Sequence, residues 1–144
     1  MYTGLLHLHS LLRWVILIFL VINIFKLLAG NRSVGLSKIL LIAAHTTLLL
    51  GLYQYFAGPM GFKLISQLGM AEVMKTSAYR FYAVEHIFGM IVAITLITIG
   101  HVKLKKGGTP KTSGVLYLIA LIIILASIPW PFREGIGRPL MPGM

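Results

Sequence analysis

Four long apolar segments limit most strongly what this chain can form. They span residues 5–29, 36–57, 80–104 and 113–130. Each is close to the roughly 20 residues that a helix needs to cross about 30 Å of hydrocarbon. The sequence therefore predicts an all-α fold, in which four transmembrane helices form a bundle and a single integral membrane domain covers residues 1–144.

The composition excludes a soluble globular protein. Hydrophobic residues make up 58% of the chain and charged residues 11%, and the mean hydropathy is +0.90. A soluble domain of this size needs more polar surface than these values allow. The first apolar segment is long enough to span, follows no basic residue and carries no small-residue cleavage site, so we expect it to remain in the protein as a membrane helix.

The stretch between the second and third apolar segments has a different character. Residues 58–80 mix apolar with polar side chains, a pattern typical of a short helix that lies in the membrane interface. Aromatic residues flank this stretch, and we expect them to anchor it near the lipid headgroups. After the fourth segment, Pro129 and Pro131 are expected to end the helix, and the tail is expected to lie across the outer face.

Basic residues are concentrated in two of the three connections. The first and third connections, with the helix ends beside them, hold seven basic residues and no acidic one: Lys26, Arg32, Lys38, Lys103, Lys105, Lys106 and Lys111. By the positive-inside rule these connections are cytoplasmic, and both termini are extracytoplasmic in a membrane of the bacterial inner-membrane type. The net charge of +10 then indicates contact with anionic lipid headgroups, and no aromatic-interleaved basic patch points to nucleic acid.

The histidines are the strongest functional signal. Ionisable groups at membrane depth cost a few kcal/mol each, so they persist mainly where they bind something or line a polar path. A single membrane histidine is more often an interhelical hydrogen-bond residue than a ligand. Here five histidines fall on three predicted helices, which favours a ligand set: His7, His9, His45, His86 and His101.

Depth and direction separate these histidines. At 100° per residue His7 and His9 point about 200° apart, so only one of them faces the bundle. At about 1.5 Å per residue, His9 and His86 each lie about 6–10 Å below the outer interface, which makes them the best-matched pair. His45 lies roughly 9 Å from the level of His86, and a tilt of about 20° removes only part of that offset. His45 with His101 near the inner surface is the alternative second site.

Other residues on these predicted helices suggest supporting roles. Arg13 lies four residues after His9 on the same face, where it would either pair with an anionic group or extend to the headgroups. Small residues recur on the face of His86, at Gly89, Ala93 and Gly100. They would admit either a neighbouring helix or the flat face of a porphyrin. Glu85, next to His86, is a candidate for proton transfer.

The lack of cysteine and the scarcity of acidic residues narrow the type of cofactor that the chain could bind. The chain has no cysteine, which excludes thiolate metal sites, iron–sulfur clusters and c-type haem attachment. Zinc usually takes three or four protein ligands and a di-metal carboxylate site needs several Glu residues, whereas only Glu85 lies within a predicted span. Two imidazoles on different helices fit haem b, with iron bound through His9, His86 or His45. Copper bound through His and Met90 lacks a clustered motif.

Three stretches carry a resemblance to a known family. They are HLHSLLRW, HTTLLLGLYQYF and EHIFGMIVAITLITIGHVKLKK, and they resemble the small four-helix membrane b-type cytochromes, the cytochrome b561-like group and the short bacterial proteins called cytochrome B. The resemblance implies one or two bis-histidine haems and electron transfer with quinones, with His9, His45 and His86 as ligand candidates. The last predicted helix has no histidine, unlike members that ligate from that helix.

We therefore expect a haem-b membrane cytochrome that passes electrons between the quinone pool and a redox partner protein at the outer face. The resemblance makes a quinone-linked oxidoreductase activity the enzymatic expectation, and the sequence assigns no catalytic residue. Two alternatives stay open. One is a non-catalytic subunit or assembly factor of a larger membrane complex, and the other is a metal transporter for copper.

Overall fold

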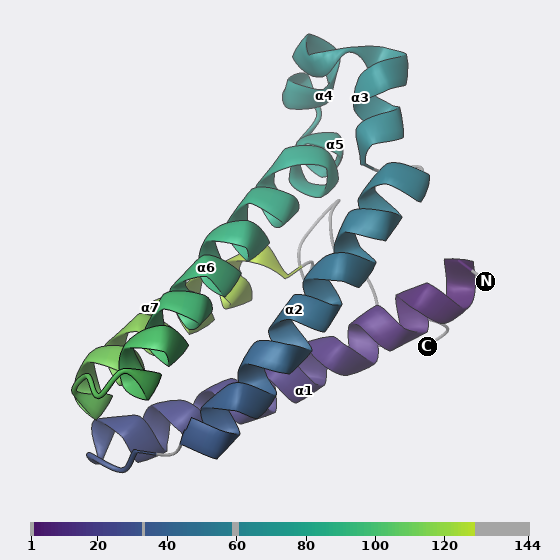
Figure 1. Cartoon of the computed structure of the whole chain (residues 1–144). Helices are drawn as coiled ribbons and strands as arrows, with labels where there is room; N and C mark the ends of the chain where they lie inside the picture. The colour runs from purple at the N-terminus through teal and green to yellow at the C-terminus, as the bar shows by residue number, and fades with distance from the viewer. Residues whose placement is uncertain (1, 33, 59–60, 129–144) are drawn as a thin grey trace.

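The computed structural model describes residues 2–32, 34–58 and 61–128, and this part of the chain contains helices and no strand (Figure 1). Four helices are long and apolar enough to cross a membrane, so the chain is a multi-pass membrane protein. The predicted all-α four-helix fold is confirmed. The long helices are α1 (Tyr2–Leu28), α2 (Val34–Ala57), α6 (His86–Lys105) and α7 (Pro110–Ser127).

Short helices connect α2 to α6 at one end of the molecule (Figure 1). The single short helix expected here is two helices, because Gly69 between them has a φ of +85°, a left-handed conformation that ends the first helix and that glycine adopts without strain. Thr76 is extended and ends the second of them, and from Ser77 the chain continues as helix without a break into α6. The short elements are α3 (Phe62–Leu68), α4 (Met70–Lys75), α5 (Ser77–Arg80) and the π-helical turn η1 (Phe81–Glu85).

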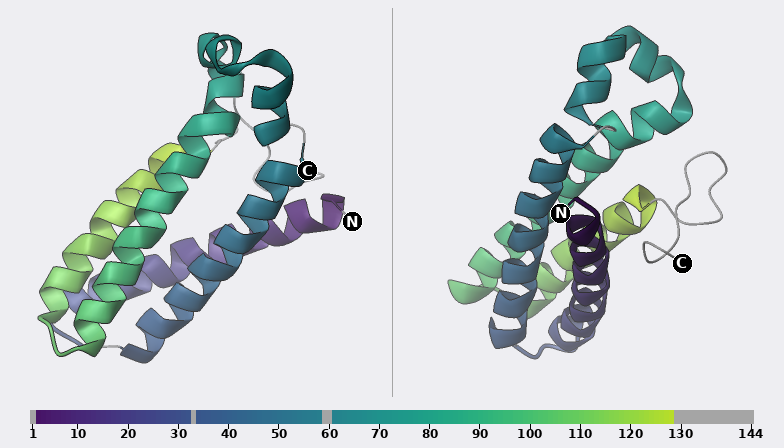
Figure 2. Two further views of the ribbon diagram at one scale, coloured as in Figure 1. Left: turned by 45° about the horizontal axis from the view of Figure 1, so that its top comes forward. Right: turned by 90° about the vertical axis from the view of Figure 1, so that its right-hand side faces the viewer.

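The four long helices pack as a ring. Helix α1 packs against α2 and α7, and α6 packs against the same two helices. Helices α6 and α7 run side by side along their length (Figures 1 and 2). Helices α1 and α6 therefore lie diagonally across the bundle, and side chains that they direct inward can meet at its centre.

The two short connections lie at the same end of the bundle. Arg32 lies in the connection after α1. Its guanidinium donates hydrogen bonds to the carbonyl oxygens of Leu104 and Gly108, more than 70 residues later in the chain. Leu104 is in the last turn of α6 and Gly108 follows the helix, so Arg32 ties the first connection to the end of α6. The basic residues of both connections thus gather at one end, opposite α3 and α4 (Figure 1). The expectation for Pro129, Pro131 and the tail lies outside the described residues.

Candidate functional site

His9 of α1 and His86 of α6 lie next to each other inside the bundle. Their ring centres are 6.4 Å apart and the ring planes are tilted by 53°. Both residues are half-buried, whereas His7 is exposed on another side of α1. His9 and His86, for which the sequence predicts the same depth in the membrane, are therefore brought together by the two diagonal helices.

The orientation of His86 is fixed by α7. The Nδ1 atom of His86 is 2.6 Å from the carbonyl oxygen of Ser127. Because a carbonyl oxygen only accepts, Nδ1 carries the proton, and Nε2 is the unprotonated nitrogen of the neutral ring. Ser127 is the last residue of α7, so its carbonyl has no partner within the helix and lies at the negative end of the helix dipole.

An aromatic ring lies next to His86. Phe81, which is 1% exposed, has its ring centre 5.9 Å from that of His86. Phe81 begins the π-helical turn that leads directly into His86, and such turns are frequent at functional sites. The Tyr55 hydroxyl of α2 donates to the carbonyl oxygen of Ala83 in this turn, at 2.7 Å, and so ties the turn to the bundle.

The His9 ring faces the backbone of α2. A Cβ atom added to Gly51 would lie 3.7 Å from Nε2 of His9, so Gly51 leaves this side of the ring without a covering side chain. Sequence reasoning did not single out Gly51 or Ser127. Depth counting could have found Gly51, which is six residues before the end of α2 at Ala57 and thus about 9 Å from it.

Arg13 is half-buried one helical turn after His9. Its guanidinium carbon lies 5.4 Å from the centre of the Trp14 ring, a cation–π contact that holds the charge beside the apolar part of the bundle. The positive charge therefore lies near the level of the two histidines, where it can attract an anionic group.

The small residues of α6 pack against α7. A Cβ atom on Gly89 would overlap the Ser127 hydroxyl and lie 3.2 Å from Ser127 Cβ, and one on Gly100 would lie 2.7 Å from the Tyr117 ring. Ala93 is fully buried in the core. These small residues therefore allow α6 and α7 to pack closely, which is one of the two roles expected for them. A role of Gly89 and Ala93 in cofactor binding stays a prediction.

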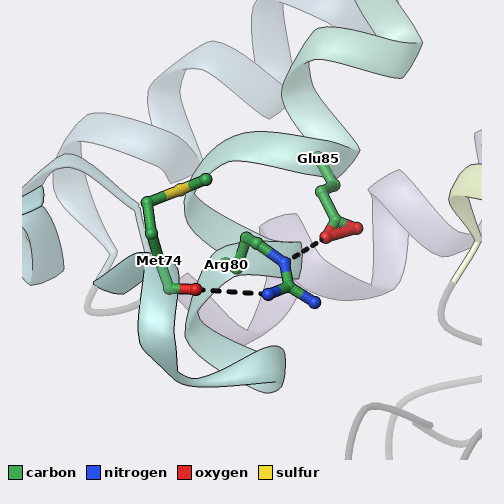
Figure 3. A network of polar contacts seen from close by, with 3 residues as sticks. All are labelled: Met74, Arg80 and Glu85. Carbon is green, nitrogen blue, oxygen red and sulfur yellow. Dashed lines mark hydrogen bonds and ion pairs between the residues drawn. The ribbon is translucent and has the colours of Figure 1, made fainter. Parts of the chain in front are cut away.

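Glu85 takes part in a network at the start of α6 (Figure 3). Its Oε1 atom accepts a hydrogen bond from Arg80 Nε at 2.7 Å, and Arg80 Nη1 donates to the carbonyl oxygen of Met74 at 3.2 Å. Glu85 is exposed, with a side-chain exposure of 44%. The network joins α4 to the start of α6, and a role of Glu85 in proton transfer stays a prediction.

The two remaining histidines have different surroundings. His45 is exposed on α2, and its Nδ1 atom is 3.0 Å from the carbonyl oxygen of Leu41 in the same helix. His101 is 7% exposed, with Nδ1 2.8 Å from the Ser37 hydroxyl. A second haem between His45 and His101 would therefore need one ligand that faces outward and one that is buried among the helices.

His101 belongs to a buried polar cluster that connects three helices. The Ser37 hydroxyl of α2 is hydrogen-bonded to His101 of α6 and to the Tyr117 hydroxyl of α7. The Ser113 hydroxyl donates to the carbonyl oxygen of Gly100 at 2.7 Å, which adds a second link between α6 and α7. His101 therefore acts as an interhelical hydrogen-bond residue, the role most common for a single membrane histidine.

The residues that the structure describes contain no group of three or more His, Cys, Asp or Glu side chains able to hold a metal ion. Two imidazoles without a third ligand therefore make up the candidate site. Comparisons with protein-family models, with curated proteins and with solved structures return no match to this chain.

Proposed function

We propose that this protein is a membrane cytochrome that binds haem b between His9 and His86. The observation that carries the proposal is the approach of these two imidazoles, with ring centres 6.4 Å apart, from diagonal helices of the bundle. Buried histidines in membrane helices mark functional sites more often than chance placement would.

The donor set fits haem better than a bare metal ion. Zinc and copper sites in proteins are usually completed by three or four protein ligands, and the described residues offer only two near each other. A porphyrin supplies its own four nitrogen ligands and needs one or two axial ones from the protein. His9 and His86, whose ring centres lie 6.4 Å apart, would hold the iron of the haem from two helices.

Residues around the pair have supporting roles in this proposal. The Ser127 carbonyl holds the His86 ring through Nδ1, and such a bond fixes the tautomer and makes the other nitrogen a better ligand. The Phe81 ring lies next to the His86 ring, Gly51 places no side chain beside His9 Nε2, and the charge of Arg13 would attract an anionic propionate. Bound haem b would supply a reversible one-electron couple.

We propose one haem per chain, with electron transfer between membrane quinone or quinol and a redox partner protein. His45 faces outward, which gives no support to a second haem shared with His101. The gathering of basic residues at one end supports an orientation in a bacterial-type inner membrane with that end cytoplasmic and both termini extracytoplasmic. Lipid headgroups are then the partners of the basic end.

The test is an absorption spectrum of the detergent-purified protein supplied with haem. We expect a Soret band, with sharper α and β bands after reduction, and reduction of the bound haem by a quinol analogue. Absence of haem binding would contradict the proposal. It would favour a non-catalytic subunit or assembly factor, for which the histidine of the Ser37 cluster already shows the packing role.

A further inference from the structure

Two adjacent polar residues of α2 face the hydrocarbon. His45 and Thr46 are both exposed, and they are the twelfth and thirteenth of the 24 residues of α2, Val34–Ala57. Their position near the middle of the span puts both at the same depth, far from the interfacial water. Polar side chains at this depth almost always face the protein interior or find a partner.

Thr46 differs from three other threonines in the interior of the long helices. The hydroxyls of Thr47, Thr95 and Thr98 donate to the carbonyl oxygen four residues earlier, at 2.7 to 2.8 Å, as threonines in helices commonly do. Within the described part of the chain the Thr46 hydroxyl makes no such bond. It remains a free donor on the outer surface of α2.

His45 offers the matching acceptor. Its Nδ1 atom donates to the carbonyl oxygen of Leu41, so the neutral ring presents the lone pair of Nε2. An exposed acceptor and an exposed donor therefore lie beside each other in a medium that offers neither of them water. Leaving both unpaired in hydrocarbon is unfavourable.

The two polar residues flank an apolar seam. Ile42, Leu49 and Phe56 recur every seven residues along α2 and are 56%, 69% and 56% exposed. At 100° per residue, His45 and Thr46 lie about 50° to either side of the line through Ile42 and Leu49. A seven-residue repeat keeps a seam in line along two paired helices.

We propose that this face of α2 pairs with the same face of a second copy of the chain, around a two-fold axis along the membrane normal. Copies inserted in the same direction can be related by such an axis, which brings the flank of one seam against the opposite flank of the other. The Thr46 hydroxyl then donates to Nε2 of the partner's His45, and the reverse bond forms by symmetry.

The self-complementarity of the surface selects a second copy over an unrelated protein. A two-fold interface requires that residue i contacts residue j and that j contacts i. The Thr46 donor and the His45 acceptor lie at the same depth on opposite flanks of the seam, so they meet this requirement. Each of the two groups then has a hydrogen-bond partner. This dimer does not depend on the proposed haem site, which lies inside each bundle.

Cysteine cross-linking in native membranes tests the interface, because the chain has no cysteine of its own. Oxidation of the variant Leu49→Cys should give a covalent dimer of the chain. The matched control is Ile122→Cys on α7, which is also apolar and is 60% exposed, and which should give no dimer. Equal cross-linking of the two variants, or cross-linking of Leu49→Cys to a different protein, would overturn the proposal.

The hydrogen bonds are tested by energy transfer between labelled copies in lipid vesicles. His45→Leu and Thr46→Val each remove both reciprocal bonds, so each should weaken association by about ten-fold or more. The double variant should be no weaker than either single variant, since the same bonds are lost. Thr95→Val, at an exposed threonine whose hydroxyl bonds within α6, should leave association unchanged. Additive losses in the double variant, or an equal loss with Thr95→Val, would overturn the paired bonds.

Discussion

Ser37 is the residue through which three helices share hydrogen bonds. Its hydroxyl is bonded to both His101 and Tyr117, which are 7% and 0% exposed. The variant Ser37→Ala would leave two buried polar groups without this partner, and an unsatisfied buried group costs about 1–3 kcal/mol. We expect the free energy of unfolding to fall by an amount of that order, measured by denaturant titration in mixed micelles.

Ser66→Ala is the matched control for this variant. Ser66 is exposed in the short helix α3, so the same chemical change there should alter the free energy of unfolding by less than about 0.5 kcal/mol. If both variants unfold alike, the Ser37 cluster does not stabilise the bundle.

For single residues, the sequence predicts the depth of a side chain in the membrane better than the direction in which it points. Counting residues placed His9 and His86 at one level, and their rings lie 6.4 Å apart. The outward direction of His45 could not be predicted, because lipid and protein interior are both apolar and the period of 3.6 residues that marks the inner face of a soluble helix is lost. The Ser127 carbonyl is a backbone group, and it carries no sequence signal of its own.

Gly100 determines how closely α6 and α7 approach each other. A Cβ atom at this position would lie 2.7 Å from the ring of Tyr117, which is fully buried and hydrogen-bonded to Ser37. The ring therefore has little room to move aside. We expect Gly100→Ala to lower the free energy of unfolding by about 1–3 kcal/mol through overpacking, measured in the same micelle assay.

Gly35→Ala is the matched control for Gly100→Ala. Gly35 is also helical, and a Cβ atom there meets nothing within 4 Å, so alanine should be neutral or stabilising through its higher helix propensity. An equal loss of stability in the two variants would contradict the packing role of Gly100.

Most of the helical elements could be predicted from length and hydropathy alone. The expected span 36–57 and the observed α2 (Val34–Ala57) differ by two residues at one end. The break at Gly69 and the π-helical turn at Phe81–Glu85 were not predicted. Both depend on the backbone conformation of single residues, which tertiary contacts such as the bond from Tyr55 to Ala83 help to set.

The distribution of charge over the whole molecule makes the orientation in the membrane testable. Lys106 directly follows α6 and Ser66 lies in α3, and the end of α6 and helix α3 are at opposite ends of the molecule (Figure 1). We expect Ser66→Cys to react with a membrane-impermeant maleimide in intact cells. Lys106→Cys should react only after permeabilisation. The reverse labelling pattern would place the termini in the cytoplasm and the His9 level near the inner leaflet.

Haem binding by single-histidine variants decides whether His9 and His86 form the site. Wild-type protein and the variants His9→Ala, His86→Ala and His45→Ala are purified and titrated with haem, and absorption and electron paramagnetic resonance spectra are recorded. We expect wild type and His45→Ala to bind one haem per chain in six-coordinate, low-spin form. His9→Ala and His86→Ala should both lose that form, because each removes one of the two neighbouring imidazoles. Loss of the low-spin haem in His45→Ala together with its retention in His9→Ala would contradict the proposed site.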